Sequence, residues 1–244
     1  VNKRGSDDSL IVAASAATAT RLAQGAYPGN SMDQVKWVGT IGADYGVIAV
    51  AGDSDVVTLG ELLENLKNKP KKWVIGGGSA VGGWDHLKVL MAAKEYGISN
   101  VRKIKYVSFD GGGDAVTQLL AGNVQIFTGD VSEIKGFVDA GDIKIIAVLS
   151  PDRLPGDFSK FYTAKEQGVN VVGANWRGFY VPKGMSDDAY NFWAGAIKKM
   201  YDTPQWKKTM AKNGLAPLDL SGKAFEGFVS NSVASIKTIS KQIG

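Results

Sequence analysis

The fold of this chain is decided by one stretch, Lys72-Trp73-Val74-Ile75-Gly76-Gly77-Gly78-Ser79-Ala80-Val81-Gly82-Gly83-Trp84-Asp85-His86. The short apolar run that ends at Ile75 predicts a buried strand, and the segment from Trp84 to Tyr96 carries apolar residues at helical spacing. A turn of small residues separates the two. The order of strand, glycine turn and helix aims free backbone N–H groups and the positive end of a helix dipole at one point.

An anion suits such a point, because a helix N-terminus stabilises a nearby negative charge by about 0.3–1 kcal/mol, or up to about 2 kcal/mol when partly buried. The plain alternative is that the glycines only let the strand turn tightly into its helix. Five glycines surround Ser79, which is more than a plain turn needs, so we favour a ligand. The dinucleotide fingerprint does not match, since Val81 stands where its third glycine belongs, and no Walker-type phosphate loop occurs. The pattern therefore favours a small carboxylate over a nucleotide.

Composition excludes several classes of site. The 244 residues are 44% hydrophobic and 21% charged, which is ordinary for a globular protein. The absence of cysteine excludes disulfides, thiolate metal sites and a cysteine nucleophile, and the single histidine, His86, argues against histidine metal sites and most acid–base pairs. The net charge is 28 − 24 = +4, which mildly favours anionic ligands. No basic run with interleaved aromatic residues predicts nucleic-acid binding, and no stretch approaches the ~20 apolar residues of a membrane span. We expect no cofactor.

The order of elements from Trp73 to Leu149 is predicted to be β-α-β-α-β-α-β, which specifies parallel strands with helices on both faces. Further strands are expected at 103–109, 123–128 and 143–149, and Asp114 and Ser132 are the expected N-caps of two of the helices. Ligands bind at the carboxyl ends of the strands in such sheets. The turns at 76–83, 110–114 and 128–132 are therefore expected to meet at one edge and form a pocket.

The flanking segments predict a second, smaller set of elements. A strand at 10–14 precedes a small-residue turn at 15–20, and the apolar run at 37–50 is interpreted as two strands, of which the second, at 46–50, is a candidate crossing between domains. A capping box at Thr58 opens a helix, a strand at 175–182 leaves the central domain, and the remainder from Ser186 is helical. His86, Trp84 and Trp176 are interpreted as packed side chains.

The order of these motifs resembles the substrate-binding proteins of tripartite tricarboxylate transporters, also called Bug receptors. The resemblance spans nearly the whole chain and rests on the following matches: Val1-Asn2-Lys3-Arg4-Gly5, Asp8-Ser9-Leu10-Ile11, Thr58-Leu59 with Leu62, Gly76-Gly77-Gly78-Ser79 with Gly82, Phe109-Asp110-Gly111-Gly112-Gly113-Asp114-Ala115, Leu119-Leu120-Ala121-Gly122-Asn123-Val124, Ala147-Val148-Leu149-Ser150 with Arg153, Glu166 with Gly168, and Trp176-Arg177-Gly178.

The resemblance implies a two-lobed α/β periplasmic binding protein of type II, with a ligand cleft between lobe 1 (1–50 and 176–244) and lobe 2 (51–175). It further implies a monomeric, non-enzymatic periplasmic receptor that binds a small organic acid, a di- or tricarboxylate with a citrate-like acid favoured, and hands it to membrane permease subunits. Backbone N–H groups of loops are expected to hold the carboxylates. The resemblance implies Ser15, Ala16 and Thr18 as site residues. The turns at the sheet edge and the chemistry of a guanidinium add Gly78, Ser79, Ala80, Val81, Gly82, Gly83, Thr128, Gly129, Asp130 and Arg177.

Two roles and two alternatives stay open. Asp130 serves equally well as a helix cap, and Arg177 equally well as an ion-pair partner between the lobes. Relatives carry additional segments before Val1 and between Gly5 and Asp8, so we expect that segments are missing from this sequence, the signal peptide among them. The alternative functions are an α/β enzyme that uses a divalent metal on Asp85, Asp110, Asp114 and Asp130, and the effector-sensing domain of a transcription regulator.

Overall fold

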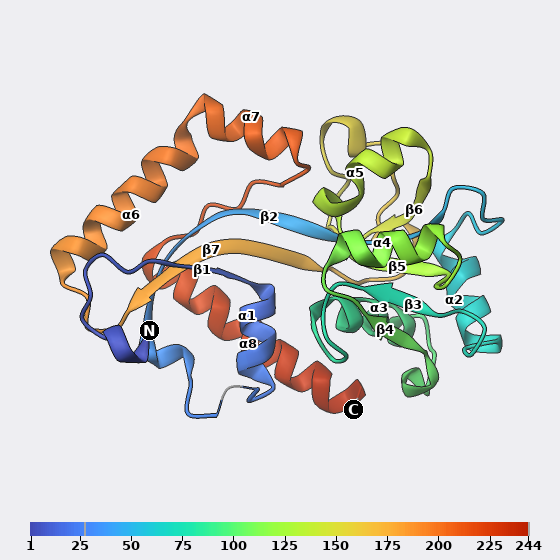
Figure 1. Cartoon of the computed structure of the whole chain (residues 1–244), viewed down its shortest axis with the longest axis horizontal. Helices are drawn as coiled ribbons and strands as arrows, with labels where there is room; N and C mark the ends of the chain where they lie inside the picture. The colour runs from blue at the N-terminus through green and yellow to red at the C-terminus, as the bar shows by residue number, and fades with distance from the viewer. Residues whose placement is uncertain (27, 244) are drawn as a thin grey trace. The chain divides into compact units, whose positions relative to one another are not determined.

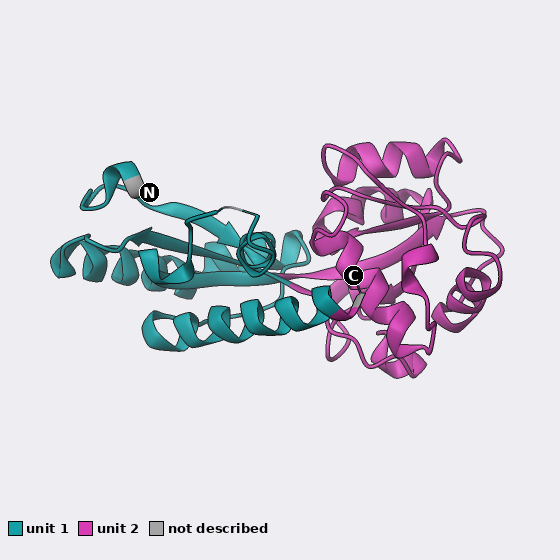
Figure 2. Ribbon diagram, turned by 90° about the horizontal axis from the view of Figure 1, so that it is seen from below, with its two compact units in different colours: residues 1–43, 175–241 teal, residues 44–174, 242–244 magenta. Residues whose placement is uncertain are grey.

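The computed structural model describes residues 1–26 and 28–243, and the chain forms two compact units, coloured separately in Figure 2. Unit 1 comprises Val1–Ala43 and Asn175–Lys241, and unit 2 comprises Asp44–Ala174 with the last residues of the chain. The chain therefore passes between the units after Ala43 and after Ala174, whereas the sequence places these boundaries after residues 50 and 175.

The sheet of unit 2 carries the predicted parallel strands. Strand β3 (Ile75–Gly77) lies between β4 (Tyr106–Ser108) and β5 (Ile126–Asp130) and is parallel to both (Figure 1). The second half of β2 (Val35–Ala51) runs antiparallel to β5 on one side and to β6 (Ile143–Val148) on the other. The strands β3, β4, β5 and β6 thus share one direction, as predicted, and the sheet is mixed because β2 enters it in the opposite direction.

Four helices connect these strands: α2 (Leu59–Asn68), α3 (Trp84–Glu95), α4 (Gly112–Leu120) and α5 (Val131–Ala140). The predicted cap of α2 is confirmed, since the Thr58 hydroxyl accepts the N–H of Glu61 at 3.2 Å. The predicted caps Asp114 and Ser132 are wrong. Helix α4 begins after Gly111, and α5 begins after Asp130, whose carboxylate caps the helix while Glu133 closes a reciprocal capping box.

Two strand predictions are also wrong. The run at 37–50 forms one strand, β2, because its glycines mark close approaches of other segments instead of breaks: a β carbon on Gly39 would lie 3.3 Å from the Leu220 carbonyl oxygen. The strand expected at 103–109 is shorter in the structure, where β4 covers only Tyr106–Ser108, because Val101–Lys103 forms a 3-10 turn. Local pattern alone does not show which neighbour a backbone segment will meet.

Unit 1 pairs β1 (Val12–Ser15) antiparallel with β7 (Ala174–Pro182). Its aromatic core confirms that Trp176 is a packing residue: the ring lies 5.3 Å from that of Phe225 and 5.9 Å from that of Trp37, centroid to centroid. The expected small-residue turn after β1 is the start of a helix. The remaining helices and 3-10 turns of the chain are α1 (Ala16–Ala23), α6 (Asp187–Asp202), α7 (Pro204–Lys212), α8 (Gly222–Ile243), η1 (Asn2–Arg4), η2 (Met32–Gln34), η4 (Gly156–Phe158) and η5 (Lys165–Gln167).

Within the described ranges, no helix combines the length and the apolar character needed to cross a membrane.

Candidate functional site

The two glycine turns of unit 2 meet backbone to backbone. A β carbon on Gly78 would lie 2.6 Å from the carbonyl carbon of Gly111 and 2.7 Å from the nitrogen of Gly112, so only glycine permits this approach. The contact follows from topology, because the turns leave the adjacent parallel strands β3 and β4 at the same edge. Together they line a pocket of about 750 Å³ with Gly78, Ala80, Ser108, Phe109, Asp110, Gly111 and Asp114.

Hydrogen bonds inside the first turn fix its shape. The Ser79 hydroxyl accepts the N–H of Asp85 at 3.0 Å and thereby caps α3 from a distance of six residues. The N–H of Gly83 donates to the Ala80 carbonyl oxygen at 2.7 Å. Within residues 1–26 and 28–243, the backbone N–H groups of Ala80 and Val81 find no acceptor. These two donors and the start of α3 are among the groups that the turn offers to an anion.

His86 and Tyr106 hold the same turn from beneath. The N–H of Gly82 donates to Nδ1 of His86 at 3.0 Å, the imidazole stacks on the Tyr106 ring at 4.4 Å between centroids, and the Tyr106 hydroxyl donates to the Ser79 carbonyl oxygen at 2.8 Å. Burial lowers the pKa of His86 to about 4, so the ring is neutral and Nδ1 is free to accept. Burial raises the pKa of Tyr106 to about 12, so its hydroxyl keeps the proton that it donates.

The third turn, Thr128 to Asp130, lies at the same edge but beneath the surface. Thr128 is fully buried, Asp130 is 3% exposed, and neither is among the residues that line the pocket. The Thr128 hydroxyl donates to the Asp85 carbonyl oxygen at 3.1 Å, and the Gly129 carbonyl oxygen and the Asp130 carboxylate each accept from the ammonium of Lys88 at 2.7 Å. The polar groups of this turn thus bond within the protein.

The pocket surface itself carries negative charge. Two carboxylates, Asp110 and Asp114, stand among its lining residues, and those residues include no lysine or arginine. Glu133 adds a third carboxyl nearby: partial burial, reinforced by the neighbouring carboxylates of Asp130 and Asp85, raises its pKa to about 7. Attraction for an anion must therefore come from backbone N–H groups and helix ends.

Unit 1 gathers the other predicted site residues. The Ser15 hydroxyl accepts the N–H of Ala17 at 3.2 Å, and the Ser15 N–H donates to the Thr18 hydroxyl at 3.3 Å, which makes the capping box of α1. Arg177 stands opposite Ser15 in the register of β1 and β7, and Ala16 between the two capping residues is buried. Ser15, Ala16, Thr18 and Arg177 are thus neighbours within this unit.

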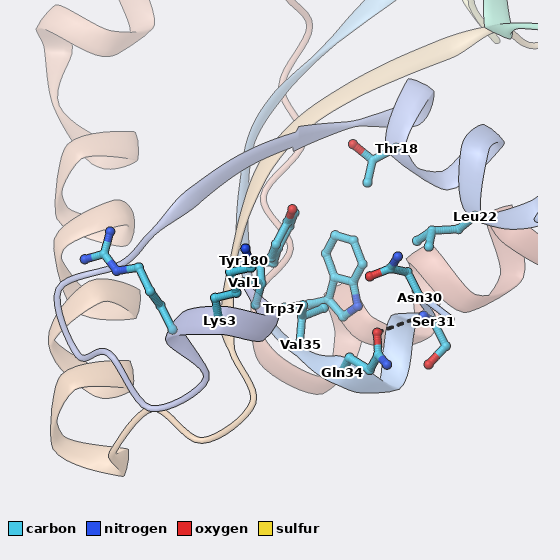
Figure 3. A pocket seen from close by; sticks show the side chains of 11 residues that line it. Val1, Lys3, Thr18, Leu22, Asn30, Ser31, Gln34, Val35, Trp37 and Tyr180 are labelled. Carbon is cyan, nitrogen blue, oxygen red and sulfur yellow. Dashed lines mark hydrogen bonds between the residues drawn. The ribbon is translucent and has the colours of Figure 1, made fainter. Parts of the chain in front are cut away.

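A second cavity, of about 510 Å³, lies wholly within unit 1 (Figure 3). Thr18 and Leu22 of α1 lie along it, and the side chain of Gln34 accepts the N–H of Ser31 on the opposite part of its wall. The lining residues are Val1, Lys3, Arg4, Thr18, Leu22, Asn30, Ser31, Gln34, Val35, Trp37 and Tyr180. Of the predicted site residues, Thr18 alone lines it.

Sequence reasoning missed Lys88, and it assigned no role in the turn to His86 or Tyr106. Lys88 stands at a core-facing position of α3, four residues after Trp84 and one after Leu87, with Asp85 three residues before it. A single lysine on the apolar face of a helix, with a carboxylate at i−3, is the signal that would have identified it. Lys88 also bears on the alternative function of a metal-dependent enzyme. Of the four carboxylates expected to hold the metal, Asp85 and Asp130 are bonded to Lys88.

Across the residues that the structure describes, no group of three or more histidine, aspartate or glutamate side chains is placed to hold a metal ion.

The fold and the turns together define the class of the protein. Two compact α/β units, with glycine turns at the carboxyl ends of parallel strands, are the architecture of a periplasmic binding protein. The family described as "Tripartite tricarboxylate transporter family receptor" matches residues 5–244, and the chain belongs to it. The resemblance deduced from the sequence is thereby confirmed.

Individual relatives are distant in sequence and similar in fold. A curated protein of Cupriavidus necator, "UPF0065 protein in gbd 5'region", is 23% identical over 203 residues, which cover 83% of this chain and 60% of the relative. Among solved structures, Rpa4515 of R. palustris with adipate has a TM-score of 0.84 at 20% identity, covering 96% of this chain and 77% of the other. MatC of Rhodopseudomonas palustris with bound malate has a TM-score of 0.80 at 14% identity, covering 96% and 80%. The chain thus spans about three fifths of the length of the curated relative.

Proposed function

We propose that this protein is a periplasmic solute receptor that binds a small organic acid and delivers it to the permease subunits of a tripartite transporter, without catalysing a reaction. The observation that carries the proposal is the meeting of the two glycine turns, which line a pocket together with Ala80, whose N–H has no acceptor among the described residues. The structures with adipate and malate support a carboxylate as the ligand. We propose a di- or tricarboxylate, with a citrate-like acid favoured, and a monomeric receptor.

Within unit 2, the backbone of residues 78–83 is proposed to bind one carboxylate, and Thr128, Gly129 and Asp130 support that backbone from beneath. Within unit 1, Ser15, Ala16, Thr18 and Arg177 form a second group whose hydroxyls and guanidinium have the chemistry to bind a carboxylate. The two groups of residues lie in different units, so substitutions in one group test its role separately from the other.

Thermal unfolding against a panel of acids tests the proposal. The panel comprises citrate, tricarballylate, succinate, malate, adipate, glutamate and aspartate. A ligand at a hundred times its Kd stabilises the folded state by about 2.7 kcal/mol, which corresponds to a rise in Tm of roughly 5–10 °C for a chain of this size. One acid that stands out supports the receptor and names its substrate class, whereas a flat panel contradicts carboxylate binding.

A further inference from the structure

Lys88 is a charged side chain with no exposure to solvent, and its bonding is complete. Its three N–H donors have three acceptors: the Gly129 carbonyl oxygen at 2.7 Å, the Asp130 carboxylate at 2.7 Å and the Asp85 carboxylate at 3.0 Å. Burial opposes the charge, but the carboxylates of Asp130 and Asp85 outweigh it and hold the pKa of Lys88 above its usual range. The side chain is therefore a buried cation at neutral pH.

The surrounding backbone leaves room for this side chain and little else. A β carbon on Gly46 would lie 2.6 Å from Cδ of Lys88, and one on Gly173 would lie 3.0 Å from the same atom. These two glycines come from segments far apart in sequence and are joined by a hydrogen bond of 2.8 Å from the Gly46 N–H to the Gly173 carbonyl oxygen. The aliphatic stem thus passes through a channel that the two glycines make possible.

The acceptors of Lys88 belong to two elements of the candidate site. Asp85 is the second residue of α3, directly after the glycine turn, and its N–H is the one that the Ser79 hydroxyl accepts. Gly129 and Asp130 end β5 and start α5. We propose that Lys88 is a positioning residue of the ligand site, which holds the first turn of α3, and with it the N–H groups of residues 78–83, against the end of β5. This inference rests on the proposed function for the identity of the site.

A charge-balanced double variant tests the role. Lys88→Met alone leaves the carboxylates of Asp85 and Asp130 without their cation and is expected to unfold the protein. The double variant Lys88→Met/Asp130→Asn removes the pair together: methionine is unbranched and fits the channel, and asparagine still caps α5. The matched control is Lys94→Met, an exposed lysine on the same helix.

Two readouts are compared for the full chain: the Kd for the acid found in the thermal panel, and amide hydrogen exchange of residues 78–86 without ligand. We expect the double variant to remain folded, to bind at least tenfold more weakly and to exchange faster in this segment, while Lys94→Met matches the wild type in both. A folded double variant with an unchanged Kd and unchanged exchange overturns the inference and leaves the receptor function intact. If the wild type binds no acid, the proposed function is wrong, and the role of Lys88 is judged from hydrogen exchange alone. Faster exchange of residues 78–86 in the double variant then supports positioning by Lys88, and unchanged exchange overturns it.

Discussion

The Glu133 carboxylate accepts the backbone N–H of Asp130 at 2.8 Å, and this bond places Glu133 directly against the start of α4. A β carbon on Gly112, the first residue of α4, would collide with that carboxyl group, as would one on Gly129. Two glycines therefore make room for a carboxyl group beside the wall of the candidate pocket. Ionisation of the Glu133 carboxyl group therefore adds a negative charge beside the pocket wall.

Stability is expected to depend on pH through Glu133. Its pKa rises from 4.5 to about 7 on folding, mainly because the carboxyl group loses water. Between these two values the unfolded chain releases the proton while the folded protein retains it, so stability that is complete below pH 4.5 is lost as the pH rises to about 7. The side chain is more than a third exposed, so we expect a loss on the order of 1 kcal/mol or less.

Urea unfolding from pH 4.5 to pH 8 measures this loss. The difference in stability between the wild type and Glu133→Gln isolates the Glu133 contribution from that of other titrating groups, and it should fall as the pH rises from 4.5 to about 7. Glu95→Gln, an exposed glutamate on α3, should follow the wild-type profile. Identical pH profiles for the wild type and Glu133→Gln would refute the assignment.

The contribution of His86 to stability is expected to depend on pH in the opposite direction. Its pKa falls from 6.5 to about 4 on folding because of burial, so its contribution is complete above pH 6.5 and is lost as the pH falls towards 4. Protonation of Nδ1 also removes the acceptor of the Gly82 N–H, which should loosen the glycine turn and weaken ligand binding. His86→Phe preserves the stacking on Tyr106 but has no acceptor; we expect about 1 kcal/mol lower stability at neutral pH. Calorimetric titration with the ligand at pH 7.5 and pH 4 compares the two proteins: because the pKa of His86 is about 4, affinity should drop more steeply between these pH values in the wild type than in the variant, which should bind weakly at both.

A single methyl group at Gly78 should separate the two glycine turns. Because the new β carbon would meet the backbone of Gly111 and Gly112 and not a movable side chain, we expect Gly78→Ala to cost about 1–3 kcal/mol and to reduce ligand affinity severely. Gly113→Ala is the matched control: it lies on α4 with open space around it, and alanine there should stabilise the helix by roughly 0.5–1 kcal/mol. Chemical denaturation and ligand titration on both variants check this; a Gly78→Ala protein that binds normally would show that the turns need not touch.

Removal of one carboxylate from the pocket wall should strengthen the binding of an anion. Asp114 lies in the first turn of α4 and lines the pocket. Asp114→Asn eliminates its repulsion, which we expect to raise affinity for a dicarboxylate roughly two- to fivefold, corresponding to about 0.4–1 kcal/mol at an exposed site. Helix stability should fall slightly in return, because an acid in the first turn favours the helix dipole. Added salt should reduce the difference between the variant and the wild type; an affinity difference that is insensitive to salt would contradict an electrostatic origin.

The sequence predicts well wherever the determinant is local. Helix α3 follows from apolar spacing after the glycine turn, and the shared direction of β3 to β6 follows from alternation with helices. Predictions go wrong where a distant segment decides. The glycines of β2 resemble strand breaks until the segments that approach them are known. Lys88 was missed for the same reason, since a lysine on a helix is usually exposed, and its acceptors at residues 129 and 130 lie some forty positions away. The start of α5 is different, because its capping box between Asp130 and Glu133 is local and Asp130 was one of the caps that the sequence left open.

The contact between Gly78 and Gly111 has a consequence for how such a receptor can change its ligand. In the proposed site the carboxylate is bound by main-chain amides, which have no side chain to exchange, so substitutions within the turns can only preserve or damage binding. Within unit 2, we therefore expect selectivity to depend on the side chains that line the pocket beside the turns, which are Ser108, Phe109, Asp110 and Asp114. A designer who wishes to redirect this protein to another acid should leave the glycines alone and vary those four positions.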